Sequence, residues 1–145
     1  MSNEKPIGIF DSGFGGLTVA RAVMDLLPAE DVVYFGDTAR YPYGPKPLNE
    51  VREFAFQIVE YLINEHDVKL LVVACNTAAA AALDDLSAEI SVPIIGVIAP
   101  GTQAAIDVSR TGLIGVIGTV GTVNSGAYKR AFSTLSDGEI QPLTL

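Results

Sequence analysis

The segment Leu70-Leu71-Val72-Val73-Ala74-Cys75-Asn76-Thr77 decides the fold of this 145-residue chain. Its first five residues are a continuous apolar run, which is typical of a parallel strand covered by helices on both faces. The Ala-rich stretch 76–89 that follows predicts a helix. A buried strand leading directly into a helix indicates an α/β protein.

The same alternation continues toward both ends of the chain. Further apolar runs predict strands at residues 7–10, 32–35, 93–97 and 113–117. Helical patterns between them predict helices at residues 15–27, 48–62, 101–108 and 121–132. Strands that alternate regularly with helices along the chain predict a mainly parallel sheet flanked by helices, with right-handed crossovers.

Pro100-Gly101 is the expected boundary between two lobes, residues 1–99 and 100–145. Residues 140–145 have the pattern of an opening sixth strand. If this strand is the last element of a parallel sheet, no following helix covers it, and another part of the protein must do so. The alternatives are an edge strand and a truncated chain, and we favour truncation.

Composition excludes several classes of function. The formal charge is −8 and the pI about 4.4, with no basic stripe to meet phosphates, which disfavours binding to nucleic acid or to anionic membrane. The start has no signal-peptide pattern and no 18-residue apolar span occurs, so we expect a cytoplasmic protein. The single cysteine agrees with a reducing compartment. Together with His66 it supplies too few ligands for zinc, so no metal is expected.

Small hydrogen-bonding residues follow the predicted strands, where open α/β sheets bind ligands. They include Asp11-Ser12-Gly13, Gly36-Asp37-Thr38, Cys75-Asn76-Thr77 and Gly118-Thr119. If the first and third strands are neighbours, Asp11 and Cys75 face one crevice.

Cys75 stands between a strand and the first turn of a helix. Unpaired backbone N–H groups and the helix dipole favour negative charge there, and therefore the reactive thiolate. A buried structural cysteine is the alternative. Asn76 and Thr77 can cap the helix or bind an anionic ligand. Asp11 can cap the next helix, bond the backbone of its turn, or hold a substrate ammonium.

Other residues carry weaker signals. Ser12 can cap or bind a ligand, and Tyr43 can pack over the sheet edge or cover a small ligand. Thr119 and Thr122 can bind a carboxylate, although plain capping is favoured. A dinucleotide fingerprint starting at Gly13 fails, because Thr18 stands where its last glycine belongs. His66 is expected at the opposite edge of the sheet from Cys75, which argues against a Cys–His dyad.

Taken together, four segments resemble the glutamate racemase family within the aspartate/glutamate racemases. They are residues 8–17 (GIFDSGFGGL), 36–44 (GDTARYPYG), 74–78 (ACNTA) and 117–122 (IGTVGT). The resemblance runs from residue 7 to about residue 130, and the set of four in this order is highly specific.

The resemblance implies interconversion of L- and D-glutamate, without metal or other cofactor, to supply D-glutamate for bacterial peptidoglycan. In this family two cysteines flank the substrate α-carbon; one removes the proton and the other donates one to the opposite face. Carried onto this chain, Cys75 is one catalytic thiol, supported by Asp11. The substrate-binding residues implied are Asp11, Ser12, Tyr43, Gly44, Asn76 and Thr77, with Thr119 and Thr122 as weaker candidates.

The chain also departs from the family pattern. Family members are about twice as long, and their second cysteine lies in a Gly-Cys-Thr-His-like segment that this chain lacks. Their later part returns to complete the first lobe, so the sheet here is expected to miss strands. We therefore expect no racemisation by these residues alone, and exposed apolar surface that favours self-association, for example as a homodimer. A non-catalytic module for acidic amino acids and an aspartate racemase are the alternatives.

Overall fold

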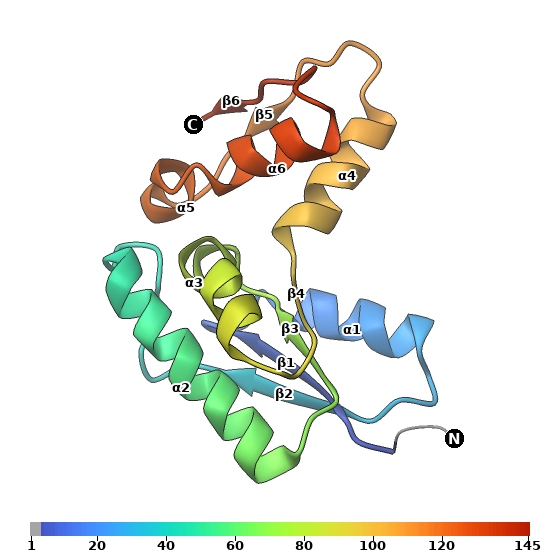
Figure 1. Ribbon diagram of the computed structural model, residues 1–145, viewed down its shortest axis with the longest axis vertical. Coiled ribbons are helices and arrows are strands. Elements are labelled where there is room, and N and C mark those ends of the chain that lie inside the picture. Colours follow the sequence, from blue (N-terminus) through green and yellow to red (C-terminus); the bar gives the residue numbers. More distant parts are fainter. Residues whose placement is uncertain (1–3) are drawn as a thin grey trace.

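A four-stranded parallel sheet forms the lower of two lobes in Figure 1. The computed structural model describes residues 4–145. The strand order is β2-β1-β3-β4, from β1 (Ile7–Asp11), β2 (Val32–Gly36), β3 (Leu70–Val73) and β4 (Ile94–Gly96). Three helices flank this sheet, namely α1 (Leu17–Leu26), α2 (Leu48–His66) and α3 (Asn76–Glu89). The predicted α/β class with a parallel, helix-flanked sheet is confirmed.

The central strands β1 and β3 are covered on both faces, which explains their continuous apolar runs. Ile7 and Ile9 of β1 pack with Ala20 of α1 on one face. Phe10, the residue after Ile9, points to the other face and packs there with α2 and α3. Successive strand residues point to opposite faces, so a strand covered on both sides needs apolar residues at every position.

The strand order reverses between β1 and β3. From β1 the chain steps to β2 on one side, whereas from β3 it steps to β4 on the other. In the register, Ile7 lies beside Leu70 and Phe10 beside Val73, which confirms the predicted neighbours. Ligands of open α/β sheets bind at such a reversal of strand order, outside the carboxyl ends.

The upper lobe contains α4 (Ile98–Val108), α5 (Val120–Asn124) and α6 (Ala127–Leu135), with a parallel pair of short strands, β5 (Gly115–Val116) and β6 (Leu143–Thr144). The chain enters this lobe through Val97, the residue between β4 and α4. Because a proline in the first helical turn loses no intrahelical bond, α4 includes Pro100 and begins three residues before the predicted start.

The single helix predicted over residues 121–132 is wrong. The structure has two helices, and Gly126 at the break adopts a left-handed conformation with φ of 70°. Ser125 stabilises the break, since its hydroxyl donates to the Thr122 carbonyl and accepts from the Ala127 N–H. Glycine at a positive φ ends one helix and re-aims the next at little steric cost.

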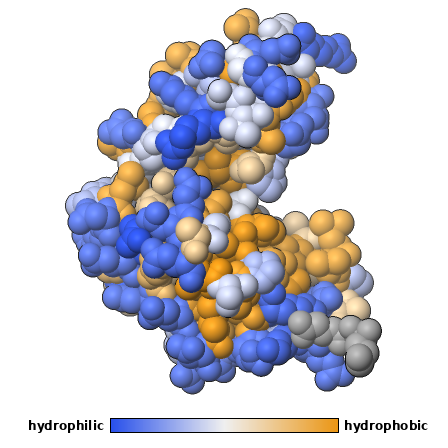
Figure 2. Space-filling model, viewed as in Figure 1, coloured by the Kyte–Doolittle hydropathy of each residue, from blue (hydrophilic) through white to orange (hydrophobic). Residues whose placement is uncertain are grey.

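Apolar side chains are exposed on the β5–β6 pair and at the edge strand β4. Leu113, Ile117, Leu143 and Leu145 border or belong to the pair. Ile95, in the middle of β4, is 50% exposed. Figure 2 shows a broad apolar area on the lower lobe near β4 and α1. Within residues 4–145, no helix is long and apolar enough to cross a membrane.

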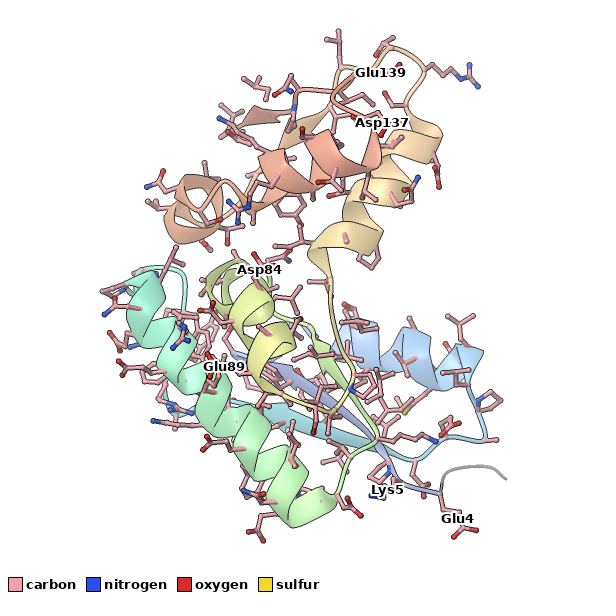
Figure 3. All side chains as sticks on the ribbon, viewed as in Figure 1. Glu4, Lys5, Asp84, Glu89, Asp137 and Glu139 are labelled. Atoms are coloured by element: carbon pink, nitrogen blue, oxygen red, sulfur yellow. The ribbon has the colours of Figure 1, made fainter. Side chains whose placement is uncertain are left out.

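Most of the acidic excess lies at the surface. Figure 3 labels Asp84 and Glu89 on α3, and Asp137 and Glu139 beyond α6; all four are exposed. Among the described residues, only two charged side chains are buried, Asp11 and Asp37. Both lie at the carboxyl ends of neighbouring strands, at the edge where the sequence places the candidate site.

Candidate active site

Asp11, the last residue of β1, holds the turn that leads into α1 in place through hydrogen bonds. Its Oδ2 accepts hydrogen bonds from the backbone N–H groups of Gly13, at 3.0 Å, and Gly16, at 3.1 Å. A carboxylate at the start of a helix also interacts favourably with the helix dipole. Among the described residues, Oδ1 has no hydrogen-bond partner. Asp11 therefore bonds the backbone of its turn with one oxygen and has the other available.

Cys75 is the N-cap residue of α3. Its Sγ accepts a hydrogen bond from the Ala78 N–H at 3.4 Å, and its thiol donates to Ser12 Oγ at 3.6 Å. The side chain is 5% exposed. Because Phe10 of β1 pairs with Val73 of β3, Ser12 and Cys75, each two residues beyond this pair, meet at one edge of the sheet. The thiol thus has polar partners on two sides, at the topological reversal.

Tyr34 of β2 is a neighbour of this site that the sequence analysis missed. Its hydroxyl donates to the Gly13 carbonyl at 3.1 Å, on the turn that Asp11 fastens. Burial, followed by the nearby charges of Asp11 and Cys75, raises the pKa of Tyr34 from 10.0 to about 12. The available signal was the alternation of side chains along residues 32–35, which places Tyr34 on the same face as Val32, the face that α1 covers.

Asp37, the second buried acid, organises the loop after β2. It accepts hydrogen bonds from the Tyr43 hydroxyl and from Arg40 Nε, the latter at 2.6 Å. The Arg40 guanidinium also lies 4.2 Å from the centre of the Phe54 ring, a cation–π contact. Burial and the bond to Asp37 raise the pKa of Tyr43 above its usual value. A buried carboxylate is tolerated here because a cation and a hydroxyl satisfy it.

Tyr43 therefore packs over the sheet edge, one of its two predicted roles. Its side chain is fully buried in the core formed with α2 and α3, and its hydroxyl is engaged by Asp37. Gly44, the next residue, lies against the upper lobe, since a Cβ there would stand 2.9 Å from Thr119 Cγ2. This close approach of backbone to side chain requires glycine.

Asn76 and Thr77 face the upper lobe. The Tyr128 hydroxyl donates to Asn76 Oδ1 at 2.6 Å. The Thr77 hydroxyl lies 3.2 Å from the hydroxyl of Thr119, which in turn lies 2.9 Å from that of Thr122. Thr119 also accepts from the Thr122 N–H and so caps α5, the role favoured from the sequence. The first residues of α3 are thus tied to α5 and α6.

An open groove of about 730 Å³ lies beside these inter-lobe contacts. It is lined by the loop after Tyr43 and by α5, including Gly44, Lys46, Thr119 and Asn124.

His66 lies elsewhere, as predicted: it is the last residue of α2, at the opposite edge of the sheet, with its ring edge-on to Tyr61. Within the described residues, no group of three or more His, Cys, Asp or Glu side chains could hold a metal ion.

A family model described as Asp/Glu/Hydantoin racemase matches residues 16–142. A glutamate racemase from Corynebacterium diphtheriae is 53% identical over 138 residues, which are 95% of this chain and 52% of that protein. One from Streptococcus pneumoniae is 48% identical over 139 residues, again covering 52% of its length. This chain therefore spans about half the length of these relatives.

Solved structures give the same result. Glutamate racemase isoform RacE1 from Bacillus anthracis superposes with a TM-score of 0.92 and 49% identity, over 97% of this chain and 52% of that one. The enzyme from Francisella tularensis, solved in complex with D-glutamate, has a TM-score of 0.86 and 39% identity, over 97% of this chain and 52% of its own. With the family model matching most of its length, this chain belongs to the Asp/Glu/hydantoin racemase family and is a homologue of the glutamate racemases.

Proposed function

We propose that this chain carries one thiol half of a glutamate racemase site, in which Cys75 moves a proton at the α-carbon of glutamate. The observation that supports this most is the place of Cys75 as the N-cap of α3, with an N–H group and a hydroxyl on its sulfur. A thiolate is favoured at a helix start, where N–H groups and the dipole face it.

In the proposed reaction the Cys75 thiolate takes the α-proton and becomes a thiol. The electron pair of the broken C–H bond stays on the substrate and delocalises into its carboxylate. Hydrogen-bond donors at the start of α3, including Asn76 and Thr77, stabilise the charge that develops there. Return of a proton from the thiol regenerates the thiolate and the amino acid.

The other site residues bind and orient the substrate. Asp11 holds the ammonium group through Oδ1, while its Oδ2 keeps the turn in place. Ser12 stands beside the sulfur and accepts the thiol hydrogen bond. Tyr43, being buried, acts by holding the loop against Asp37, so that Gly44 offers its backbone to the ligand beside Thr119.

Inversion needs a second acid on the opposite face of the substrate, because one group returns the proton to the face from which it came. The 145 residues contain a single cysteine. We therefore propose that the second thiol comes from outside these residues. By themselves they exchange the α-hydrogen of one enantiomer with solvent and do not invert it.

The test is incubation with L- or D-glutamate in D₂O, followed by proton NMR and chiral chromatography. We expect the α-proton signal of one enantiomer to fade without appearance of the other. Cys75→Ser should abolish the exchange and retain the fold, since serine is a favoured N-cap residue. Inversion by the pure chain would contradict the single-thiol proposal.

Two further outcomes identify the alternatives. Glutamate binding without exchange, unchanged in Cys75→Ser, would indicate a binding module that does not use the thiol. Faster exchange with aspartate than with glutamate would indicate an aspartate racemase. Glutamate is proposed because the most similar relatives above are glutamate racemases.

A further inference from the structure

We propose that Tyr128 is a positioning residue for the candidate site: from the upper lobe it holds the Asn76 side chain, so that the amide donor of Asn76 faces the ligand at the start of α3. This inference rests on the proposed function. Tyr128 does not touch the reacting atoms, and it acts through Asn76 alone.

The hydrogen bond between Tyr128 and Asn76 joins the two lobes directly beside the candidate catalytic thiol. Asn76 is the first residue of α3 and follows Cys75 directly, whereas Tyr128 is the second residue of α6. The hydroxyl-to-Oδ1 distance is 2.6 Å, across 52 positions of sequence. An asparagine amide accepts through oxygen and donates through nitrogen. With Oδ1 engaged by a donor, the planar amide is held with its NH₂ group turned away from Tyr128, and Asn76 is exposed enough to offer that group to a ligand.

Tyr128 is itself well fixed. It lies one helical turn before Phe132, whose side chain is fully buried. Gly126, with its left-handed backbone, sets the direction in which α6 starts. Burial raises the pKa of Tyr128, so that its hydroxyl stays protonated and remains a donor. The helix break that the sequence did not predict is therefore what aims this hydroxyl at α3.

A second contact acts in parallel. Thr77, the next residue of α3, shares a hydrogen bond with Thr119 of the same upper lobe. Thr77 also accepts a hydrogen bond from the Thr122 hydroxyl, so both residues that follow the thiol are tied to that lobe through hydroxyl groups. A merely structural role for Tyr128 would affect stability, whereas a positioning role must appear at Asn76 and in ligand affinity.

The direct test is a ¹⁵N–¹H correlation spectrum of the chain, whose mass is 15.2 kDa. Asn76→Ala identifies the side-chain amide pair of Asn76. Tyr128→Phe, which removes only the hydroxyl, is expected to shift that pair and bring its two protons closer to averaging. Tyr61→Phe is the matched control, because Tyr61 is half-exposed on α2, and should leave the pair unchanged.

Calorimetric titration with L-glutamate supplies the second measurement. Loss of one hydrogen bond that orders a binding group should weaken affinity about 3- to 10-fold in Tyr128→Phe. In the Asn76→Ala background the same substitution should have no further effect, because its target is gone.

Each result decides the proposal. A shifted Asn76 amide with weaker, non-additive glutamate binding supports it. An unchanged amide, or a shifted amide with unchanged affinity, overturns it, and so does an equal loss of affinity in the Asn76→Ala background. If the parent chain binds no glutamate, the proposed function fails, and the amide resonances alone then decide whether Tyr128 fixes Asn76.

Discussion

Gly16 stands at the point where three parts of the candidate site meet, so its substitution is the sharpest test of the packing described above. A Cβ at Gly16 would lie 2.6 Å from Asp11 Cβ, 3.0 Å from Ala74 Cβ and 3.1 Å from the Tyr34 hydroxyl. The two Cβ atoms are fixed to the backbone and cannot rotate away. Gly16→Ala must therefore move β1, β3 or the turn that Asp11 fastens.

Two effects act in the same direction in Gly16→Ala. Overpacking of a closed site costs about 1–3 kcal/mol. Gly16 is the N-cap residue of α1, where glycine is preferred to alanine, so helix propensity does not offset the steric cost. We therefore expect a net destabilisation of about 1–2 kcal/mol.

Gly101 is the matched control. It lies within α4, and a Cβ there would meet no atom within 4 Å. Gly101→Ala is therefore expected to stabilise the chain by about 0.5–1 kcal/mol through helix propensity and reduced freedom of the unfolded chain.

Urea denaturation followed by far-ultraviolet circular dichroism measures both variants. With a slope of about 1–3 kcal/mol/M, Gly16→Ala should lower the midpoint by roughly 0.5–1 M, and Gly101→Ala should raise it slightly. If Gly16→Ala is as stable as the parent, the close packing of Gly16 against Asp11 and Ala74 is refuted.

Three other predictions follow from the same contacts. Tyr43→Phe removes a buried donor to the Asp37 carboxylate and should cost about 1.5–3 kcal/mol in urea denaturation, with Tyr61→Phe nearly neutral; an unchanged midpoint would contradict the Asp37 network. Tyr34 has its pKa raised in the folded state, to about 12, so its contribution to stability is full below pH 10 and is lost as the pH rises toward 12. Tyr34→Phe should accordingly remove part of the tyrosinate absorbance that develops above pH 11, and should lessen the fall in stability; an unchanged titration would refute the assignment. Cys75, which is almost buried, should react with Ellman's reagent more slowly in the folded chain than in urea, and glutamate should slow it further; equal rates in both states would contradict its burial.

The sequence predicted the first lobe well because its signals are local. The continuous apolar run before Cys75 is explained by a strand covered on both faces, and the spacing of Val51, Ala55 and Ile58 by the single buried face of α2. Strand ends were also predictable, and parallel strands bring their carboxyl ends to one edge. The neighbourhood of Asp11, Ser12 and Cys75 followed from those two facts.

The upper lobe was predicted less well, because two of its determinants are weak in sequence. Apolar periodicity continues across Gly126, and nothing local distinguishes a glycine within a helix from one that breaks it. Similarly, the start of α4 was placed after Pro100, although a proline is accommodated in a first turn.

By itself, the sequence determined the α/β class, the order of strands and helices in the lower lobe, and the thiol at the edge where β1 and β3 end. Only the tertiary structure decided which hydroxyls hold that edge: Tyr34 on the turn of Asp11, Tyr43 on Asp37, and Tyr128 on Asn76. Periodicity and capping act within a few residues, whereas these bonds join partners that are brought together by the packing of separate elements. Their geometry therefore exists only once the whole chain has folded.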